Sequence, residues 1–254
     1  MSSREHPKHD QAEALGSNRP NKFARLNYST LGEYKVQFDL RTIRNVIVKQ
    51  IKPSDDDSSI YEMFNRLNTG GINLTPQEIR ASLYHSAFYD MLFRLNMDTR
   101  WRQLVGQAEP DLHMRDIEVL LRGVAMWQQG DSYAPSMVRF LNRYSKRAQN
   151  FTEAQVSEVE GMLEWFLSIV RDVPRAAFLT PQGRFSLPLF ESVFTATGQL
   201  RDRPVEFTLD PGIIDAIKND SRFLEYSQEQ TTNTSNVKGR LRVARDFLVR
   251  GPQR

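Results

Sequence analysis

The stretch "FNRLNTGGINLTPQEIR", Phe64 to Arg80, decides how the fold is read. Its centre is a run of Asn, Thr and Gly between two segments with helical patterns. Because glycine tolerates positive φ angles, Gly70 and Gly71, preceded by Asn68, predict the end of the first helix and a reversal of the chain. The sequence therefore predicts a pair of helices joined by a bend at the two glycines.

The helices on either side of this bend have local signals of their own. Residues 53–59, "PSDDDSS", supply acidic and hydroxyl groups suited to a helix N-terminus, and an apolar stripe with the helical period follows at Ile60, Met63, Phe64 and Leu67. After the bend, Thr75 as N-cap, Pro76 at the first helical position and Glu78 three residues after the cap form a capping box. The apolar stripe then continues to Asn96, which predicts one helix of about twenty residues.

Residues before this region predict a short β segment. Residues 1–23 are polar and charged and predict a flexible arm. The segment Tyr34 to Leu40 alternates apolar and polar residues, and Asn45 to Ile51 is β-branched and almost continuously apolar. We expect two strands here, the second more buried than the first.

The remainder predicts helices almost throughout. A polar loop is expected at Ser227 to Ser235. The expected helices are Arg115 to Trp127, Ser136 to Ala148, Thr152 to Val170, Ser186 to Ala196, Gly212 to Asn219 and Asn236 to Val249. The predicted fold class is thus α+β and mostly helical, with a flexible arm (1–23), a partial α+β domain (24–104) and a helical domain (105–254).

Composition excludes several classes of protein. The 254 residues are 39% hydrophobic and 26% charged, as in ordinary globular proteins, and contain no Cys, which removes disulfides, thiolate nucleophiles and Cys-ligated zinc. No apolar run reaches the roughly 18 to 20 residues of a membrane span, and "MSSREHPKHD" at the start lacks the apolar region of a secretory signal. We expect a cytoplasmic protein without a membrane role.

The glycine bend is also a candidate anion site. Backbone N–H groups of Asn68 to Asn73 and the N-terminus of the following helix attract phosphate, and arginine side chains add guanidinium groups. The alternative is purely structural: the glycines make the bend, Thr75 caps the helix, and the arginines cover helix surface or pair with Glu62 and Glu78. Under the functional interpretation, the phosphate-binding residues are Arg66, Asn68, Thr69, Gly70, Gly71, Gln77 and Arg80.

Two groups of basic residues are candidates for contact with nucleic acid. Near the end of the chain, the group comprises Lys238, Arg240, Arg242, Arg245 and Arg250. Of these, Lys238, Arg242 and Arg245 share one helix face at positions i, i+4 and i+7, and they are the candidate DNA-binding residues. The alternative is an ordinary solvated face. The other group surrounds the predicted strands and comprises Arg41, Arg44, Lys49 and Lys52.

Other sequence motifs indicate no further site. The four histidines do not form a zinc motif, and no G-x-x-x-x-G-K-S/T loop exists. We interpret His85 as a helix-surface residue or a half-buried residue with its hydrogen bonds satisfied, and Asp55 to Asp57 as solvated, helix-capping acids. We predict no metal site made by this chain alone.

The segment "IYEMFNRLNTGGINLTPQEIRASLY", Ile60 to Tyr84, closely resembles the signature of the N-terminal domain family of GmrSD-type restriction endonucleases. Weaker similarities follow in "HMRDIEVLLRGVAM", "SMVRFLNRY", "RAAF", "SLPLFESVF" and "GRLRVARDFL". The resemblance implies a ParB/sulfiredoxin-like fold and nucleotide-using, DNA-directed enzymes of restriction and phage defence. Their hydrolytic chemistry is associated with a D-G-Q-Q-R motif upstream of the R-L-N-T-G-G turn.

This sequence contains no D-G-Q-Q-R, so it resembles the second half of the family's domain. The main hypothesis is a subunit of a split system, in which a partner chain carries the D-G-Q-Q-R half. A nucleoside triphosphate and Mg²⁺ would then bind through the shared site, and DNA would be a further partner. The alternative hypothesis is a non-catalytic DNA-binding or protein-interaction module with a basic C-terminal helix.

Overall fold

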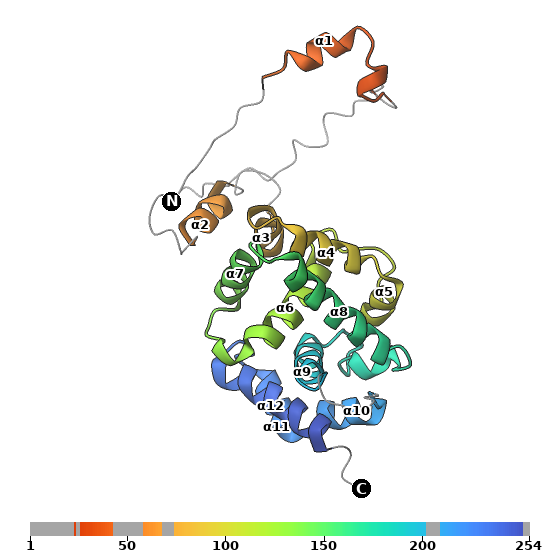
Figure 1. The fold of residues 1–254 in the computed structure, drawn as a ribbon, viewed down its shortest axis with the longest axis vertical. Helices are drawn as coiled ribbons and strands as arrows, with labels where there is room; N and C mark the ends of the chain where they lie inside the picture. The colour runs from red at the N-terminus through yellow and green to blue at the C-terminus, as the bar shows by residue number, and fades with distance from the viewer. Residues whose placement is uncertain (1–22, 24–25, 43–57, 68–73, 202–208, 251–254) are drawn as a thin grey trace, which may run out of the picture. The chain divides into compact units, whose positions relative to one another are not determined.

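The structure is a computed structural model that describes residues 23, 26–42, 58–67, 74–201 and 209–250 (Figure 1). The chain divides into two compact units, Met1–Val48 and Lys49–Arg254. Each unit is described by itself.

The first unit contains η1 (Tyr28–Thr30) and α1 (Tyr34–Asp39). The strand predicted from Tyr34 to Leu40 is therefore wrong. Val36 and Phe38, which a strand would place on one face, are 64% and 60% exposed. The backbone N–H of Leu40 donates to the carbonyl of Val36 at 3.0 Å, as in a helix. A strand needs a neighbour for its backbone polar groups, whereas a helical turn satisfies them locally. The second predicted strand, Asn45 to Ile51, lies entirely outside the described residues.

The second unit is built from helices. Their bounds are α2 (Ser58–Leu67), α3 (Pro76–Leu83), α4 (Ala87–Asn96), α5 (Thr99–Val105), α6 (Arg115–Gln129), η3 (Gly130–Ser132), α7 (Met137–Ala148), α8 (Glu153–Ile169), η4 (Arg175–Phe178), α9 (Leu187–Gly198), α10 (Pro211–Asn219), α11 (Ser221–Gln228) and α12 (Thr234–Arg250). In the described residues the only β pairing is an isolated antiparallel bridge between Leu179 and Phe185. The prediction of a mostly helical chain is confirmed. No helix in the described part is both long and apolar enough to cross a membrane.

Helix α9 forms the centre of the second unit. It packs most extensively against α6 and α12, and Figure 1 shows it enclosed between these helices and α8. Phe190 and Phe194 are almost fully buried and contact the ring of Phe166 on α8 with centroid distances of 5.7 and 4.9 Å. Because Gly198 lies directly against Trp127, α6 and α9 approach closely at this point. One hydrophobic cluster extends from Ala81 to Leu248, and the predicted domain boundary between 104 and 105 lies inside α5.

Two helix predictions need correction. The single helix expected from the Thr75 cap to Asn96 is two helices, because the chain becomes extended at Ser86, with φ −171° and ψ 171°, where α4 begins. The polar loop predicted at Ser227 to Ser235 is shorter, since α11 runs to Gln228 and α12 begins at Thr234. Helices α5 and α11 were not predicted, and both begin with an aspartate whose carboxylate binds an arginine two residues later.

A buried polar cluster joins α4, α5 and α6. The Nη1 of Arg102 donates to Oδ2 of Asp116 at 2.8 Å, and the Nδ2 of Asn96 donates to the same carboxylate oxygen at 3.0 Å. The indole N–H of Trp101 donates to Oδ1 of Asn96 at 2.9 Å. Buried polar groups are costly unless they are paired, so this cluster fixes how the three helices meet.

Candidate functional site

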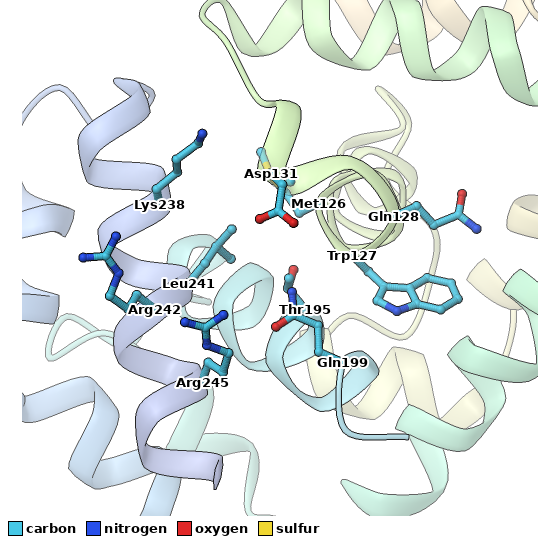
Figure 2. Close-up of a pocket in the computed structure, with 11 residues that line it drawn as sticks. Met126, Trp127, Gln128, Asp131, Thr195, Gln199, Lys238, Leu241, Arg242 and Arg245 are labelled. Atoms are coloured by element: carbon cyan, nitrogen blue, oxygen red, sulfur yellow. The ribbon is translucent and has the colours of Figure 1, made fainter. Parts of the chain in front are cut away.

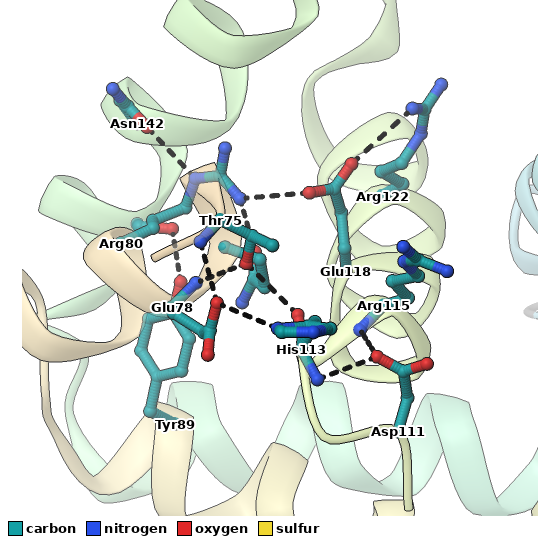
Figure 3. Close-up of polar contacts among 12 residues, drawn as sticks. Thr75, Glu78, Arg80, Tyr89, Asp111, His113, Arg115, Glu118, Arg122 and Asn142 are labelled. Atoms are coloured by element: carbon teal, nitrogen blue, oxygen red, sulfur yellow. Dashed lines mark hydrogen bonds and ion pairs between the residues drawn. The ribbon is translucent and has the colours of Figure 1, made fainter. Parts of the chain in front are cut away.

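The start of α3 is held by the predicted capping box, which is confirmed. The backbone N–H of Glu78 donates to Oγ1 of Thr75 at 3.3 Å, and the backbone N–H of Thr75 donates to Oε2 of Glu78 at 2.6 Å. The hydroxyl of Thr75 also donates to the carbonyl of His113 at 3.1 Å (Figure 3). The cap therefore ties the end of the glycine segment to the loop that precedes α6.

The environment of the Glu78 carboxylate favours its charged form. Burial by itself would raise the pKa of Glu78, but hydrogen bonds from Thr75 and the nearby His113 outweigh it and lower the pKa. The Nδ1 of His113 lies 3.5 Å from Oε2 of Glu78. The carboxylate of Glu78 thus binds the N-cap residue Thr75 and His113.

Gln77 and Arg80, two of the predicted phosphate-binding residues, are brought together on α3, and each is only 1% exposed. The Nη1 of Arg80 donates to Oε1 of Gln77, and Nε of Arg80 donates to Oδ1 of Asn142 on α7 at 2.9 Å. The same Nη1 lies 3.6 Å from Oε2 of Glu118 on α6 (Figure 3). The structural alternative expected Arg80 to pair with Glu62 or Glu78. Its ion-pair partner in the structure is Glu118.

The other predicted phosphate-binding residues are only partly described. Arg66 lies in the last turn of α2, which packs against α3, and its side chain is exposed. The four residues of the turn, Asn68, Thr69, Gly70 and Gly71, lie outside the described residues. What the structure describes of this candidate site is therefore its α2 and α3 flanks.

Arg80 belongs to a chain of alternating charges that the sequence did not predict. Nη1 of Arg122 lies 3.7 Å from Oε1 of Glu118, and its Nε contacts Oε1 of Glu191. Nη2 of Arg240 lies 3.7 Å from Oε2 of Glu191. We call this set, Arg80, Glu118, Arg122, Glu191 and Arg240, the ion-pair chain; it links α3, α6, α9 and α12.

Burial and charge act in opposite directions within the ion-pair chain. Burial by itself would lower the pKa of Arg122, but Glu191 and Glu118 raise it above the ordinary value. Burial lowers the pKa of Arg240, whose Nη1 also donates to the carbonyls of Tyr226 and Thr231 at 2.8 and 2.9 Å. The sequence signals for this chain were the i,i+4 spacing of Glu118 and Arg122 and the position of Glu191, a carboxylate inside the apolar segment "SLPLFESVF".

The basic face of the last helix forms a second candidate site. Lys238, Arg242 and Arg245 are exposed on α12, as the sequence predicted, and line a cavity of about 150 Å³. Asp131 of η3 and Thr195 of α9 also line it (Figure 2). In the other basic group, Arg41 is exposed, and Arg44, Lys49 and Lys52 lie outside the described residues.

The described residues contain no cluster of three or more His, Asp or Glu side chains placed to hold a metal ion. Mg²⁺ is usually held by one or two carboxylates together with the phosphates of a nucleotide, so these residues fit a phosphate group better than a metal held by this chain alone. His85 is exposed, as predicted, but it lies between α3 and α4 rather than on a helix, with Nε2 3.2 Å from Oδ1 of Asp90. Asp55 to Asp57 lie outside the described residues.

Comparison with known proteins gives no assignment: no family model, no curated protein and no solved structure matches this chain. The resemblance of Ile60 to Tyr84 to the GmrSD-type family therefore stays a prediction.

Proposed function

We propose that this chain is one subunit of a split GmrSD-like, nucleotide-dependent DNA restriction or phage-defence system in the cytoplasm. Its R-L-N-T-G-G turn and the start of α3 would complete a nucleotide- or DNA-phosphate site with a partner chain that carries the D-G-Q-Q-R half. The observation that carries the proposal is the pairing of Gln77 and Arg80 on α3, the helix that follows the R-L-N-T-G-G sequence.

The charge balance around Arg80 supports an anionic ligand. The ion-pair chain holds three arginines and two glutamates, which leaves one positive charge uncompensated within it. Because Arg80 and Arg122 share the single charge of Glu118, a phosphate near Arg80 would supply the negative charge that this arrangement lacks.

Gln77 supports the same conclusion. Its Nε2 is buried beside the hydroxyl of Tyr89 and makes no hydrogen bond of good geometry with the described residues. A phosphate oxygen is an acceptor for such a donor, since buried polar groups are nearly always paired. Gln77 would orient the anion and Arg80 would neutralise it.

The remaining proposed residues would complete the phosphate site. Arg66 would add a second guanidinium group from α2, and Gly70 and Gly71 would allow the backbone to approach the phosphate closely. A bound nucleotide would bring Mg²⁺ with its phosphates, and the partner chain would supply the D-G-Q-Q-R residues associated with hydrolysis.

The proposal is tested by mixing this chain with a partner chain carrying D-G-Q-Q-R and measuring nucleoside triphosphate hydrolysis and DNA nicking. Arg66→Ala and Arg80→Lys should each lower both activities about tenfold or more, since hydrogen bonds to charged groups contribute about 1.5 to 3 kcal/mol. Arg147→Ala, an exposed arginine on α7, is the matched control and should be neutral. Thermal unfolding of Arg80→Lys distinguishes lost binding from lost folding. Full activity in a folded Arg80→Lys and in Arg66→Ala would refute the site.

A second candidate function is a non-catalytic module that binds DNA through α12. It is favoured by the exposure of Lys238, Arg242 and Arg245 on one face. Binding through several phosphate contacts falls steeply with salt concentration. If the chain alone binds duplex DNA in this way, and Arg242→Ala weakens binding while Arg66→Ala does not, this candidate replaces the first.

A further inference from the structure

We propose that the groove between α6, α9 and α12 is a binding site for a single phosphate group, held by Lys238, Arg242, Arg245 and the hydroxyl of Thr195. This inference names the group that α12 would bind in the second candidate function, the DNA-binding module. It rests on that function only if the bound phosphate belongs to DNA. It does not depend on the α3 site or on a partner chain.

The charges in the groove favour an anion. In the described part of the chain, the side chains of Lys238, Arg242 and Arg245 make no hydrogen bond or ion pair. They follow one another at i, i+4 and i+7 on α12, a spacing at which like charges repel. Asp131 is the only carboxylate that lines the groove, so the cations outnumber it by two. A bound phosphate would relieve the repulsion.

Thr195 supplies a second, independent observation. It lies on α9 at the floor of the groove, is 1% exposed, and its Oγ1 has no hydrogen-bond partner among the described residues. A buried hydroxyl without a partner is unfavourable, so most such groups are paired with protein, water or ligand. Figure 2 shows Thr195 and Gln199 facing α12 across the groove from Arg245. A phosphate oxygen in the groove would accept the hydrogen bond that Thr195 lacks.

The size of the groove limits the ligand. Its volume is about 150 Å³. Pockets for drug-sized molecules measure about 300 to 1,000 Å³, so the groove fits one phosphate group rather than a whole nucleotide. That phosphate is either a free ion or one group of a nucleic-acid backbone.

The test uses the full chain alone. Binding of inorganic phosphate is measured by calorimetry at constant ionic strength, and binding of a short DNA duplex is measured by fluorescence anisotropy. Thr195→Val keeps the shape and all charges, and it should weaken phosphate binding about tenfold or more through the lost hydrogen bond. Arg245→Gln should weaken it by at least as much. Arg147→Gln, with the same charge change on α7, is the control and should be neutral.

Comparing inorganic phosphate with duplex DNA shows whether the bound phosphate is a free ion or part of a nucleic-acid backbone. Competition between duplex DNA and inorganic phosphate would identify a backbone phosphate, whereas phosphate binding without competition would identify a free ion; both support the site. The melting temperature of Thr195→Val should not fall, since the variant removes an unpaired buried hydroxyl. If the chain binds neither ligand, or if Thr195→Val and Arg147→Gln behave alike, the site does not exist. The proposed function at α3 would remain intact in that case.

Discussion

Three arginines, Arg80, Arg102 and Arg240, have lost almost all contact with solvent, with exposures of 1%, 7% and 1%. Each is compensated differently: Arg102 by the carboxylate of Asp116, Arg240 by backbone carbonyls and Glu191, and Arg80 by neutral amides and a half-exposed Glu118. Arginine is rarely buried unless it is paired, so these contacts determine whether the core tolerates the charge. Arg80 has neither a buried carboxylate nor a backbone carbonyl as a partner, so it is the one best placed to accept an external anion.

Asp116 offers a direct test of this argument. Asp116→Asn keeps the shape of the side chain but leaves the charge of Arg102 without a carboxylate. Breaking a buried ion pair in this way costs about 3 to 5 kcal/mol, so the free energy of unfolding should fall by that order in urea titrations. Asp172→Asn, at an exposed position, is the control and should change little. An equal effect of the two substitutions would contradict the role assigned to Asp116.

At the level of elements, the sequence predicts best where the signal is local. The capping box of Thr75 and Glu78 was predicted correctly because it depends only on four neighbouring residues. The break after Leu83 was not predicted, because the apolar stripe continues across it. Tyr84, the C-cap of α3, is buried although it lies outside the helix. Tertiary packing overrides local periodicity there.

Removing the cap should measure its contribution. Thr75→Ala deletes the oxygen that accepts from Glu78 and the donor to the carbonyl of His113. We expect a loss of about 1 kcal/mol in the free energy of unfolding, as for other N-caps. Thr75→Ser keeps the oxygen and should retain most of the stability. The interpretation fails if serine and alanine are equally destabilising.

The lowered pKa of Glu78 predicts how the cap responds to pH. A carboxylate with a lowered pKa stabilises the fold above its ordinary value of 4.5, and this contribution is lost as pH falls through the folded-state pKa. Glu78→Gln keeps an acceptor for the N–H of Thr75 but cannot titrate. The difference in unfolding free energy between the wild type and Glu78→Gln should therefore shrink from about pH 6 to about pH 3. A difference that is constant over this range would show that the charge of Glu78 contributes nothing.

At the level of the whole molecule, the sequence predicted the helical class and the exposed basic face of α12, because periodicity reports both. The strand at Tyr34 to Leu40 was wrong because alternation alone does not supply a pairing neighbour. For the candidate site, the sequence placed Gln77 and Arg80 together correctly, since they lie one turn apart. It could not show that Arg80 pairs with Glu118 or that Glu191 joins Arg122 to Arg240, because these contacts connect residues far apart in the chain.

The last prediction concerns the ion-pair chain, which links α3, α6, α9 and α12. Glu191 forms ion pairs with both Arg122 and Arg240, so its removal leaves two arginines without this carboxylate. Removal of Arg240 leaves Glu191 paired with Arg122. Glu191→Gln should therefore lower the free energy of unfolding by about 3 kcal/mol or more, and Arg240→Met should lower it less.

The double variant separates this network from two independent contacts. Because Glu191→Gln leaves the charge of Arg240 buried without a carboxylate, removing Arg240 as well should recover part of the loss, so the double variant should be more stable than the sum of the single effects predicts. The measurement is a double-mutant cycle by urea unfolding of the full chain. Strict additivity would mean that α9 and α12 are held together by apolar packing alone, and that the charge of Arg240 is balanced by the carbonyls of Tyr226 and Thr231.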